Sequence, residues 1–150
     1  PDHDGLLRRL AGHLAPGGVL AVQMPRQYGA PSHRFLRDIA AEMFPDRFDL
    51  SRWEPPVRAP IEYHRLLSGL GEVSVWETDY IHRLAPLAQG HPVRAFTEAT
   101  AMRPFVEKMT PAEARDFTAR YEAALASAYP VEPDRSVLFP FRRVFITLTV

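Results

Sequence analysis

The stretch from Leu14 to Pro25, LAPGGVLAVQMP, is the sequence feature that most constrains the fold. Pro16-Gly17-Gly18 ends a helix that Asp4 is predicted to cap and whose apolar residues recur one turn apart up to Leu14. Val19 to Val22 then runs apolar without alternation, which is typical of a parallel strand covered on both faces. Such a strand needs parallel partners, and we expect these to lie N-terminal of Pro1. The sequence therefore predicts an α/β fold and the C-terminal part of a larger domain.

Composition allows a real core and excludes several classes of function. The chain has 150 residues and 46% hydrophobic content, which is enough for one domain. Its 18 basic and 18 acidic residues balance, so we expect no general attraction to nucleic acid or to an anionic membrane. The absence of cysteine excludes disulfides, thiolate nucleophiles and Cys-rich metal sites. No apolar run approaches the roughly 20 residues of a membrane span, and we expect a cytoplasmic protein.

The remaining chain alternates predicted helices and strands. We expect one helix that Ser32 caps and that ends before Pro45, then a proline-rich loop over 46–60. A second helix places Tyr63 and Leu70 on one apolar face and stops at Gly71.

Three strands and one long helical segment complete the prediction. The strands cover residues 18–24, 73–82 and 138–150, and the helical segment covers 92–129. Within that segment, Arg103-Pro104 should break one helix, because proline disfavours helical geometry in the residue before it. Thr110-Pro111-Ala112-Glu113 is a capping box that starts the next helix.

Several short runs of residues resemble one family of enzymes. They are Leu20–Pro25, Trp76 with Thr78, Tyr80 and His82, Ala99–Phe105, Arg120-Tyr121 followed by Tyr129-Pro130, and Arg143–Ile146. Together these runs resemble the trans-aconitate 2-methyltransferase family of class I S-adenosylmethionine-dependent methyltransferases. The resemblance implies the C-terminal part of a Rossmann-like sheet, with strand 5 at 18–24, strand 6 at 73–82 and strand 7 at 138–150. In that fold, strand 7 returns antiparallel between strands 5 and 6, and 92–129 is a helical lid.

The resemblance also implies an activity. The full-length parent would transfer a methyl group from S-adenosylmethionine to a carboxylate of trans-aconitate or a similar small polycarboxylic acid, giving the monomethyl ester. The carboxylate has a pKa near 4 and is ionised at neutral pH, so no general base is needed. The chain would supply the acceptor side, because its one G-x-G, Gly69-Leu70-Gly71, follows a helix and precedes a strand, with Ser74 in place of a third glycine. We therefore expect no cofactor-binding or catalytic residue here, and an inactive chain on its own.

Five side chains are candidates for binding the acceptor: Arg103, Arg143, Tyr121, His33 and Tyr80. Arginine forks suit carboxylates because their donors match the two oxygens. Arg103 lies where a proline breaks the helical segment. Arg143 follows Arg142, and strand alternation sends the two side chains to opposite faces.

The other three candidates have structural alternatives. Tyr121 lies on the apolar side of its helix, where packing in the core is the alternative to a hydroxyl contact. His33 follows the strand at 18–24. It is a candidate because open α/β sheets place ligands beyond the carboxyl ends of strands. Tyr80 shares a strand face with Trp76 and could belong to an aromatic wall. The six histidines show no spacing typical of a metal site, so we expect no metal.

Two other interpretations remain open from the residues. The chain could be a non-catalytic fragment or interaction module without a cofactor site, which dimerises through an exposed strand edge. It could also belong to a methyltransferase for another small acceptor, because Gln27-Tyr28 and the loop at 46–60 depart from the family pattern. The convergence of Arg103 and Arg143 on one pocket would favour recognition of a polycarboxylate.

Overall fold

The computed structural model describes residues 2–150, apart from the side chain of Arg52. Pro1 and the strands predicted to precede it lie outside the described residues. The chain divides into two compact units, each described here by itself. The first unit contains residues up to 26, 55–80 and 141–150, and the second contains 27–54 and 81–140.

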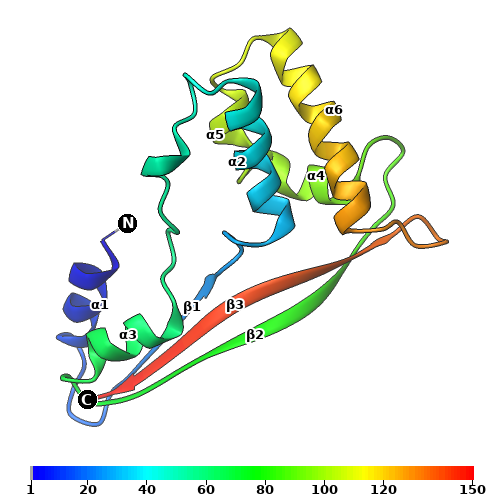
Figure 1. Ribbon diagram of the computed structural model, residues 1–150. Coiled ribbons are helices and arrows are strands. Elements are labelled where there is room, and N and C mark those ends of the chain that lie inside the picture. Colours follow the sequence, from blue (N-terminus) through cyan, green and yellow to red (C-terminus); the bar gives the residue numbers. More distant parts are fainter. Residues whose placement is uncertain (1) are drawn as a thin grey trace. The chain divides into compact units, whose positions relative to one another are not determined.

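Along the chain, each strand is preceded by one or more helices (Figure 1). The helices are α1 (His3–Ala11), α2 (Pro31–Met43), α3 (Pro60–Leu67), α4 (Pro92–Glu98), α5 (Arg103–Val106) and α6 (Pro111–Ala128), with a short 3-10 helix at Leu50–Arg52. The strands are β1 (Val19–Pro25), β2 (Glu72–Leu84) and β3 (Val137–Thr149). No helix within residues 2–150 is long and apolar enough to cross a lipid bilayer.

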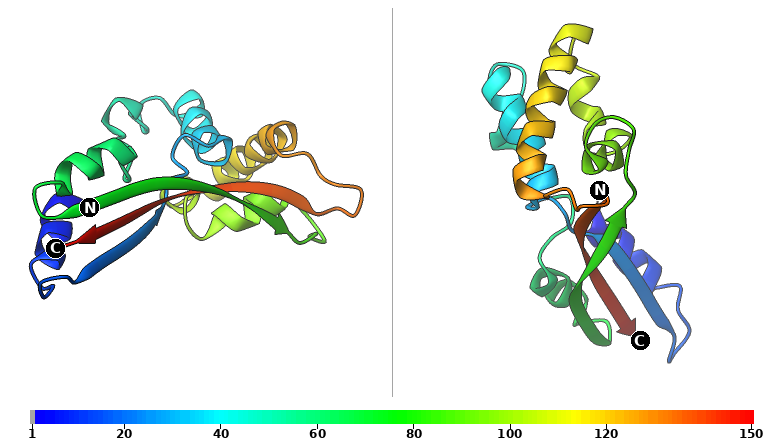
Figure 2. Two further views of the ribbon diagram at one scale, coloured as in Figure 1. Left: turned by 90° about the horizontal axis from the view of Figure 1, so that it is seen from below. Right: turned by 90° about the vertical axis from the view of Figure 1, so that its right-hand side faces the viewer.

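The three strands form one sheet in the order β1-β3-β2, and Figure 2 shows β3 between its two neighbours. β1 pairs with β3 in antiparallel register, from Val19 opposite Thr149 to Pro25 opposite Arg143. The α/β class predicted from the sequence is confirmed. The central position of the last strand is also the arrangement that the family resemblance implies.

The parallel partners predicted for the first strand lie outside the described residues, so the prediction that this strand is parallel and covered on both faces stays a prediction. Along β1, exposed residues alternate with half-buried ones, and Val19 is 57% exposed. Within the described three-stranded sheet β1 lies next to β3, and Leu20, Val22 and Met24 pack against the core. Residues 2–150 therefore cover one face of β1.

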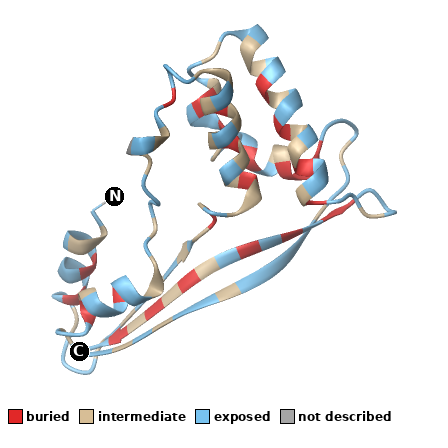
Figure 3. Cartoon of the chain, in the orientation of Figure 1, coloured by how far each residue is buried: buried red, intermediate tan, exposed pale blue. Residues whose placement is uncertain are grey.

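The core of the first unit forms where two helices cover one face of its strands. The fully packed residues are Leu7 and Ala11 of α1, Tyr63 and Leu67 of α3, and Val144, Ile146 and Leu148 of β3. Figure 3 shows the resulting alternation of buried and half-buried residues along this part of β3. Each of the buried leucine, valine and isoleucine side chains in this set contributes about 1.5–3 kcal/mol to folding.

In the second unit, α2 packs along α6. Phe117, Tyr121 and Leu125 of α6 are completely buried. The predicted capping box is confirmed: Thr110 Oγ1 accepts a hydrogen bond from Glu113 N–H (3.3 Å), and Glu113 Oε2 accepts one from Thr110 N–H (2.8 Å).

Two predicted helix starts are wrong by two residues. Asp2, not Asp4, caps α1 and accepts a hydrogen bond from Gly5 N–H at 2.9 Å. Ala30, not Ser32, is the residue before α2, because Pro31 occupies the first helical position. Proline is favoured there, since its missing N–H would have no partner within the helix.

Three helix boundaries also differ from the prediction. α1 ends at Ala11, so Leu14 lies outside it, and α3 ends at Leu67, ahead of Gly71. Arg103 begins α5, whereas α4 has already ended at Glu98. The break predicted at Arg103-Pro104 therefore lies a few residues earlier, and the proline belongs to the start of the next helix.

Gly71 serves a close contact between backbones. A Cβ atom at this position would overlap the carbonyl group of Thr149, whereas one at Gly69 would meet nothing within 4 Å. We expect Gly71→Ala to lower the free energy of unfolding by about 1–3 kcal/mol, as overpacked sites do. Urea denaturation of the intact protein that carries this chain measures the change.

Gly69→Ala is the matched control. It should leave stability unchanged or raise it slightly, because alanine restricts the unfolded chain without a clash in the folded one. Equal destabilisation by both substitutions would contradict the close-contact interpretation.

Candidate functional site

Tyr121 lies in a buried polar network at the start of α2. Its hydroxyl donates a hydrogen bond to the carbonyl of Ser32 (2.7 Å) and lies 3.1 Å from Thr97 Oγ1. Ser32 N–H donates to the hydroxyl of Tyr129 (3.1 Å). Burial raises the pKa of Tyr121 above its ordinary value, so the hydroxyl stays protonated. The network fixes the first turn of α2 to α6, and the Tyr121 hydroxyl is fully used within the protein.

His91 extends this network toward α4. Its Nε2–H donates to the carbonyl of Tyr129 (3.0 Å), while its Nδ1 accepts a hydrogen bond from Val93 N–H (3.2 Å). The residue is 6% exposed and caps α4. His91 is therefore a structural residue whose two ring nitrogens both have partners.

His33 stands at the same helix start and is half-buried. Its Nδ1 lies 3.0 Å from the hydroxyl of Ser32. Burial, and then the nearby charge of Arg37, lower the pKa of His33 to about 4. The ring is thus neutral at pH 7. It can form hydrogen bonds with a ligand, but it offers the ligand no positive charge.

Arg103 is a solvent-exposed residue of the second unit. Its side chain is 67% exposed, and its Nε donates to Glu107 at 2.6 Å, one turn further along the chain. The pKa of Arg103 lies above its ordinary value, mainly because of the hydrogen bond to Glu107. The guanidinium keeps other donors for a ligand.

Arg143 belongs to the first unit and has no carboxylate partner within the described part of the chain. Its Nη1 donates to Gln23 Oε1, and its guanidinium lies 5.0 Å from the ring centre of Phe141. The adjacent Arg142 instead pairs with both carboxylate oxygens of Asp79 (2.8 and 3.1 Å). The two arginines therefore differ in the way that matters for binding an anion: the charge of Arg143 is not neutralised.

Tyr80 joins an aromatic cluster of the first unit. Trp76 stacks on Phe145 with 5.4 Å between ring centres, and Tyr80 lies 6.3 Å from the same ring. Trp76 and Tyr80 are 46% and 41% exposed. They form an apolar surface rather than a pair of polar groups aimed at one point.

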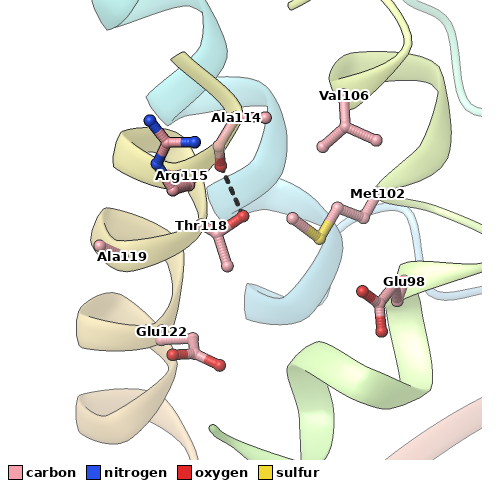
Figure 4. Close-up of a pocket in the computed structure, with 8 residues that line it drawn as sticks. All are labelled: Glu98, Met102, Val106, Ala114, Arg115, Thr118, Ala119 and Glu122. Carbon is pink, nitrogen blue, oxygen red and sulfur yellow. Dashed lines mark hydrogen bonds between the residues drawn. The ribbon is translucent and has the colours of Figure 1, made fainter. Parts of the chain in front are cut away.

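A pocket of about 470 Å³ lies between α4, α5 and α6 (Figure 4). Its lining residues are Glu98, Met102, Val106, Ala114, Arg115, Thr118, Ala119 and Glu122. Arg94 holds Glu98 (2.7 Å) and Glu122 (3.0 Å) at one end, and Thr118 donates to the carbonyl of Ala114 (2.7 Å). None of the five predicted residues lines this pocket.

The structure brings two of the five predicted residues together within the second unit. Tyr121 and His33 both contact Ser32, whereas Arg103 lies in the second unit and Arg143 in the first. Residues 2–150 contain no group of three or more His, Asp or Glu side chains placed to hold a metal ion.

Sequence reasoning missed one polar cluster, which links the starts of α1 and α3. His3 Nδ1 lies 2.7 Å from the hydroxyl of Tyr63, and the side chain of Arg58 pairs with Asp4 at 2.7 Å. His3 and Tyr63 are 60 residues apart in the chain, so no local pattern joins them. The only local indication of this cluster in the sequence is the presence of polar residues in the first turn of each helix.

The neutral state of His33 gives a pH prediction. Its pKa is about 4 in the folded protein and 6.5 in the unfolded chain, so the unfolded state binds the proton more readily between these values. Stability should therefore fall as the pH drops from 6.5 toward 4, and His33→Asn should remove part of this dependence. Urea denaturation at several pH values and an NMR titration of the ring measure it; an NMR pKa of 6 or higher would contradict the burial argument.

Comparison with known proteins gives close relatives over nearly the whole chain. The chain is 43% identical to a trans-aconitate 2-methyltransferase of Methylobacterium nodulans, with 97% of this chain and 57% of the relative aligned. Proteins of the same name from Streptomyces avermitilis and a Mycobacterium species are 40% and 38% identical, over 54% and 58% of their lengths. No family model matches the chain.

The chain thus spans little more than half the length of the curated relatives that it matches. The match confirms the resemblance that the short residue runs indicated. Over 97% of its length, this chain is homologous to the C-terminal part of the trans-aconitate 2-methyltransferases.

Proposed function

We propose that the protein carrying this chain transfers a methyl group from S-adenosylmethionine to a carboxylate of trans-aconitate, or of a similar small polycarboxylic acid, to give the monomethyl ester. The observation that carries the proposal is the similarity to proteins of that name over 97% of the chain. On this proposal β1, β2 and β3 correspond to strands 5, 6 and 7 of a class I methyltransferase sheet, and 92–129 is the lid. The order β1-β3-β2 supports that assignment.

The chain's own residues do not fit the methyl donor. Its one G-x-G turn lies between α3 and β2, and the backbone of Thr149 occupies the space beside Gly71. A turn that binds a nucleotide instead follows a strand, opens a helix and leaves its backbone free for the ligand. The part of the reaction proposed for this chain is therefore confined to the acceptor.

The chemistry of the acceptor needs positioning rather than proton transfer. A carboxylate is already the nucleophilic anion at neutral pH, because its pKa is near 4. The protein has to hold the non-reacting carboxylates firmly and to keep the reacting one in place with water excluded. Charge-assisted hydrogen bonds from arginine suit this task, since the guanidinium stays protonated and binds two oxygens at once.

Among the predicted residues, Arg143 is the proposed contact for an acceptor carboxylate. It belongs to the first unit and has only an amide and a ring as partners. Arg103, in the second unit, stays a separate prediction, and its one exposed ion pair can be replaced by a ligand at little cost. Tyr121 and His33 act indirectly, by fixing the start of α2. Tyr80 contributes an apolar wall.

The residues that depart from the family pattern do not favour a different acceptor. Gln27 is 5% exposed and donates a hydrogen bond to the carbonyl of Pro140 (3.0 Å). The hydroxyl of Tyr28 donates to the carbonyl of Trp53 (2.6 Å), and its ring lies 3.6 Å from the guanidinium of Arg37. Both side chains are used within the second unit.

An assay of the intact protein tests the proposal directly. With S-adenosylmethionine and trans-aconitate it should form the monomethyl ester, detected by mass spectrometry. Arg143→Gln should raise the KM for trans-aconitate about tenfold with a smaller effect on kcat, as the loss of one charge-assisted hydrogen bond does.

Arg142→Gln is the matched control, because it removes the same charge from the neighbouring residue, which is already paired with Asp79. Its KM should stay near that of the wild type. Absence of any ester, with a folded protein and both substrates present, would overturn the proposed function and favour a non-catalytic module.

A further inference from the structure

A cluster of polar side chains at the first turns of α1 and α3 has no part in the function proposed so far. His3 and Asp4 open α1, Tyr63 lies in the first turn of α3, and Arg58 lies two residues before that helix. All four belong to the first unit. Two helix starts meet here, and their unpaired N–H groups favour negative charge nearby.

Tyr63 determines which nitrogen of His3 carries the proton. The Tyr63 hydroxyl is completely buried and accepts a hydrogen bond from the backbone N–H of Arg58 (3.2 Å). No other acceptor for its proton is found among the hydrogen bonds of the described residues, so we assign this proton to His3 Nδ1, 2.7 Å away. A neutral imidazole that accepts at Nδ1 carries its proton at Nε2. Burial also raises the pKa of Tyr63, which keeps this hydroxyl a donor.

The Nε2–H of His3 is consequently a donor without a hydrogen-bond partner among residues 2–150. The ring is half-buried, and it forms the hydrogen bond at Nδ1 and a tilted ring contact at 5.9 Å with Tyr63. A donor held in this way is oriented before any ligand arrives.

Arg58 also keeps free donors. Its Nη1 lies 2.7 Å from Oδ1 of Asp4, and the two side chains are 43% and 45% exposed. That oxygen is buried and makes no well-aligned hydrogen bond to any described residue. Nε and Nη2 of Arg58 make none in the described part of the chain either. The guanidinium is thus held by a single, poorly aligned ion pair, and its fork remains available to another carboxylate.

Arg26 fixes the cluster at one end of a strand. Its Nε donates to the carbonyl of Arg58 (3.1 Å), and its Nη1 pairs with Glu77 (2.8 Å). Arg26 directly follows the last residue of β1. The cluster therefore lies beyond the carboxyl end of β1, the position where open α/β sheets bind their ligands.

We propose that His3 and Arg58 form a binding site for one carboxylate of the acceptor, held by the Nε2–H of His3 and the free guanidinium donors of Arg58. The proposal rests on the proposed function for the identity of the ligand. Tyr63 is a positioning residue, because it acts through His3. Asp4 is an internal carboxylate that competes for Arg58.

Calorimetric titration of the intact protein with trans-aconitate tests this site. Arg58→Gln should weaken binding about tenfold, and His3→Ala should weaken it about threefold, through the loss of one charged and one neutral hydrogen bond. Asp4→Asn should tighten binding, because the competing charge is gone. A merely structural cluster would not give opposite signs for Arg58 and Asp4.

Two further measurements serve as controls. Arg65→Gln, a change of the same charge on α3, should leave the affinity unchanged. The ¹⁵N shifts of His3 should report a proton on Nε2 in the wild type and a mixture of tautomers in Tyr63→Phe. An unchanged affinity in a folded Arg58→Gln variant, or weaker binding in Asp4→Asn, would overturn the inference.

The outcomes separate this site from the proposed function. If the wild type methylates trans-aconitate and Arg58→Gln binds it normally, only the site is wrong. If the wild type binds trans-aconitate through Arg58 but forms no ester, the site stands and the proposed function fails. If the wild type neither binds nor methylates trans-aconitate, both are wrong.

Discussion

The insertion of the last strand between the other two is the constraint on which the rest of the structure depends. β3 pairs with β1 along the whole of β1, and its Val144, Ile146 and Leu148 supply the strand side of the first unit's core. The end of the chain also closes the Gly17-Gly18 turn, where Gly17 N–H donates to the carbonyl of Val150 at 2.7 Å. Gly17 has a φ of 77°, a left-handed conformation that favours glycine. The turn singled out at the start of the sequence is therefore completed by the residues at its end.

Local signals in the sequence predicted much of this fold. Features that depend on contacts between distant residues were not predicted. The capping box at Thr110 predicted the start of α6 because both of its hydrogen bonds are local. The start of α2 was displaced because Pro31, at the first helical position, is a stronger signal than the neighbouring Ser32. The apolar run at Val19 to Val22 predicted a strand, but a local run of residues does not show which strands lie beside it in the sheet.

The residues of the candidate site also divide into those that local patterns predicted and those that depend on contacts between distant parts of the chain. Periodicity placed Tyr121 on the apolar side of α6, and the structure shows that burial there leaves its hydroxyl fully occupied by Ser32 and Thr97. The pairing of His3 with Tyr63 depends on how α1 meets α3, which no spacing in the sequence encodes. The short runs that resemble the family likewise do not show which of their side chains keep free donors, because this depends on the partners that the fold brings to them.

The distribution of free and occupied donors favours exposed cations as the groups that recognise an acceptor. Removing the Tyr121 hydroxyl from its partners would strand buried polar groups, which costs about 1–3 kcal/mol each. Breaking a half-exposed ion pair such as Arg58–Asp4 costs less, since such pairs contribute about 0–1 kcal/mol. A ligand carboxylate can therefore replace Asp4 at Arg58, or join the neutral partners of Arg143, without unfolding what holds either residue in place. The buried tyrosines of the second unit hold the start of α2, and on the proposed function Arg58 and Arg143 of the first unit bind the carboxylates.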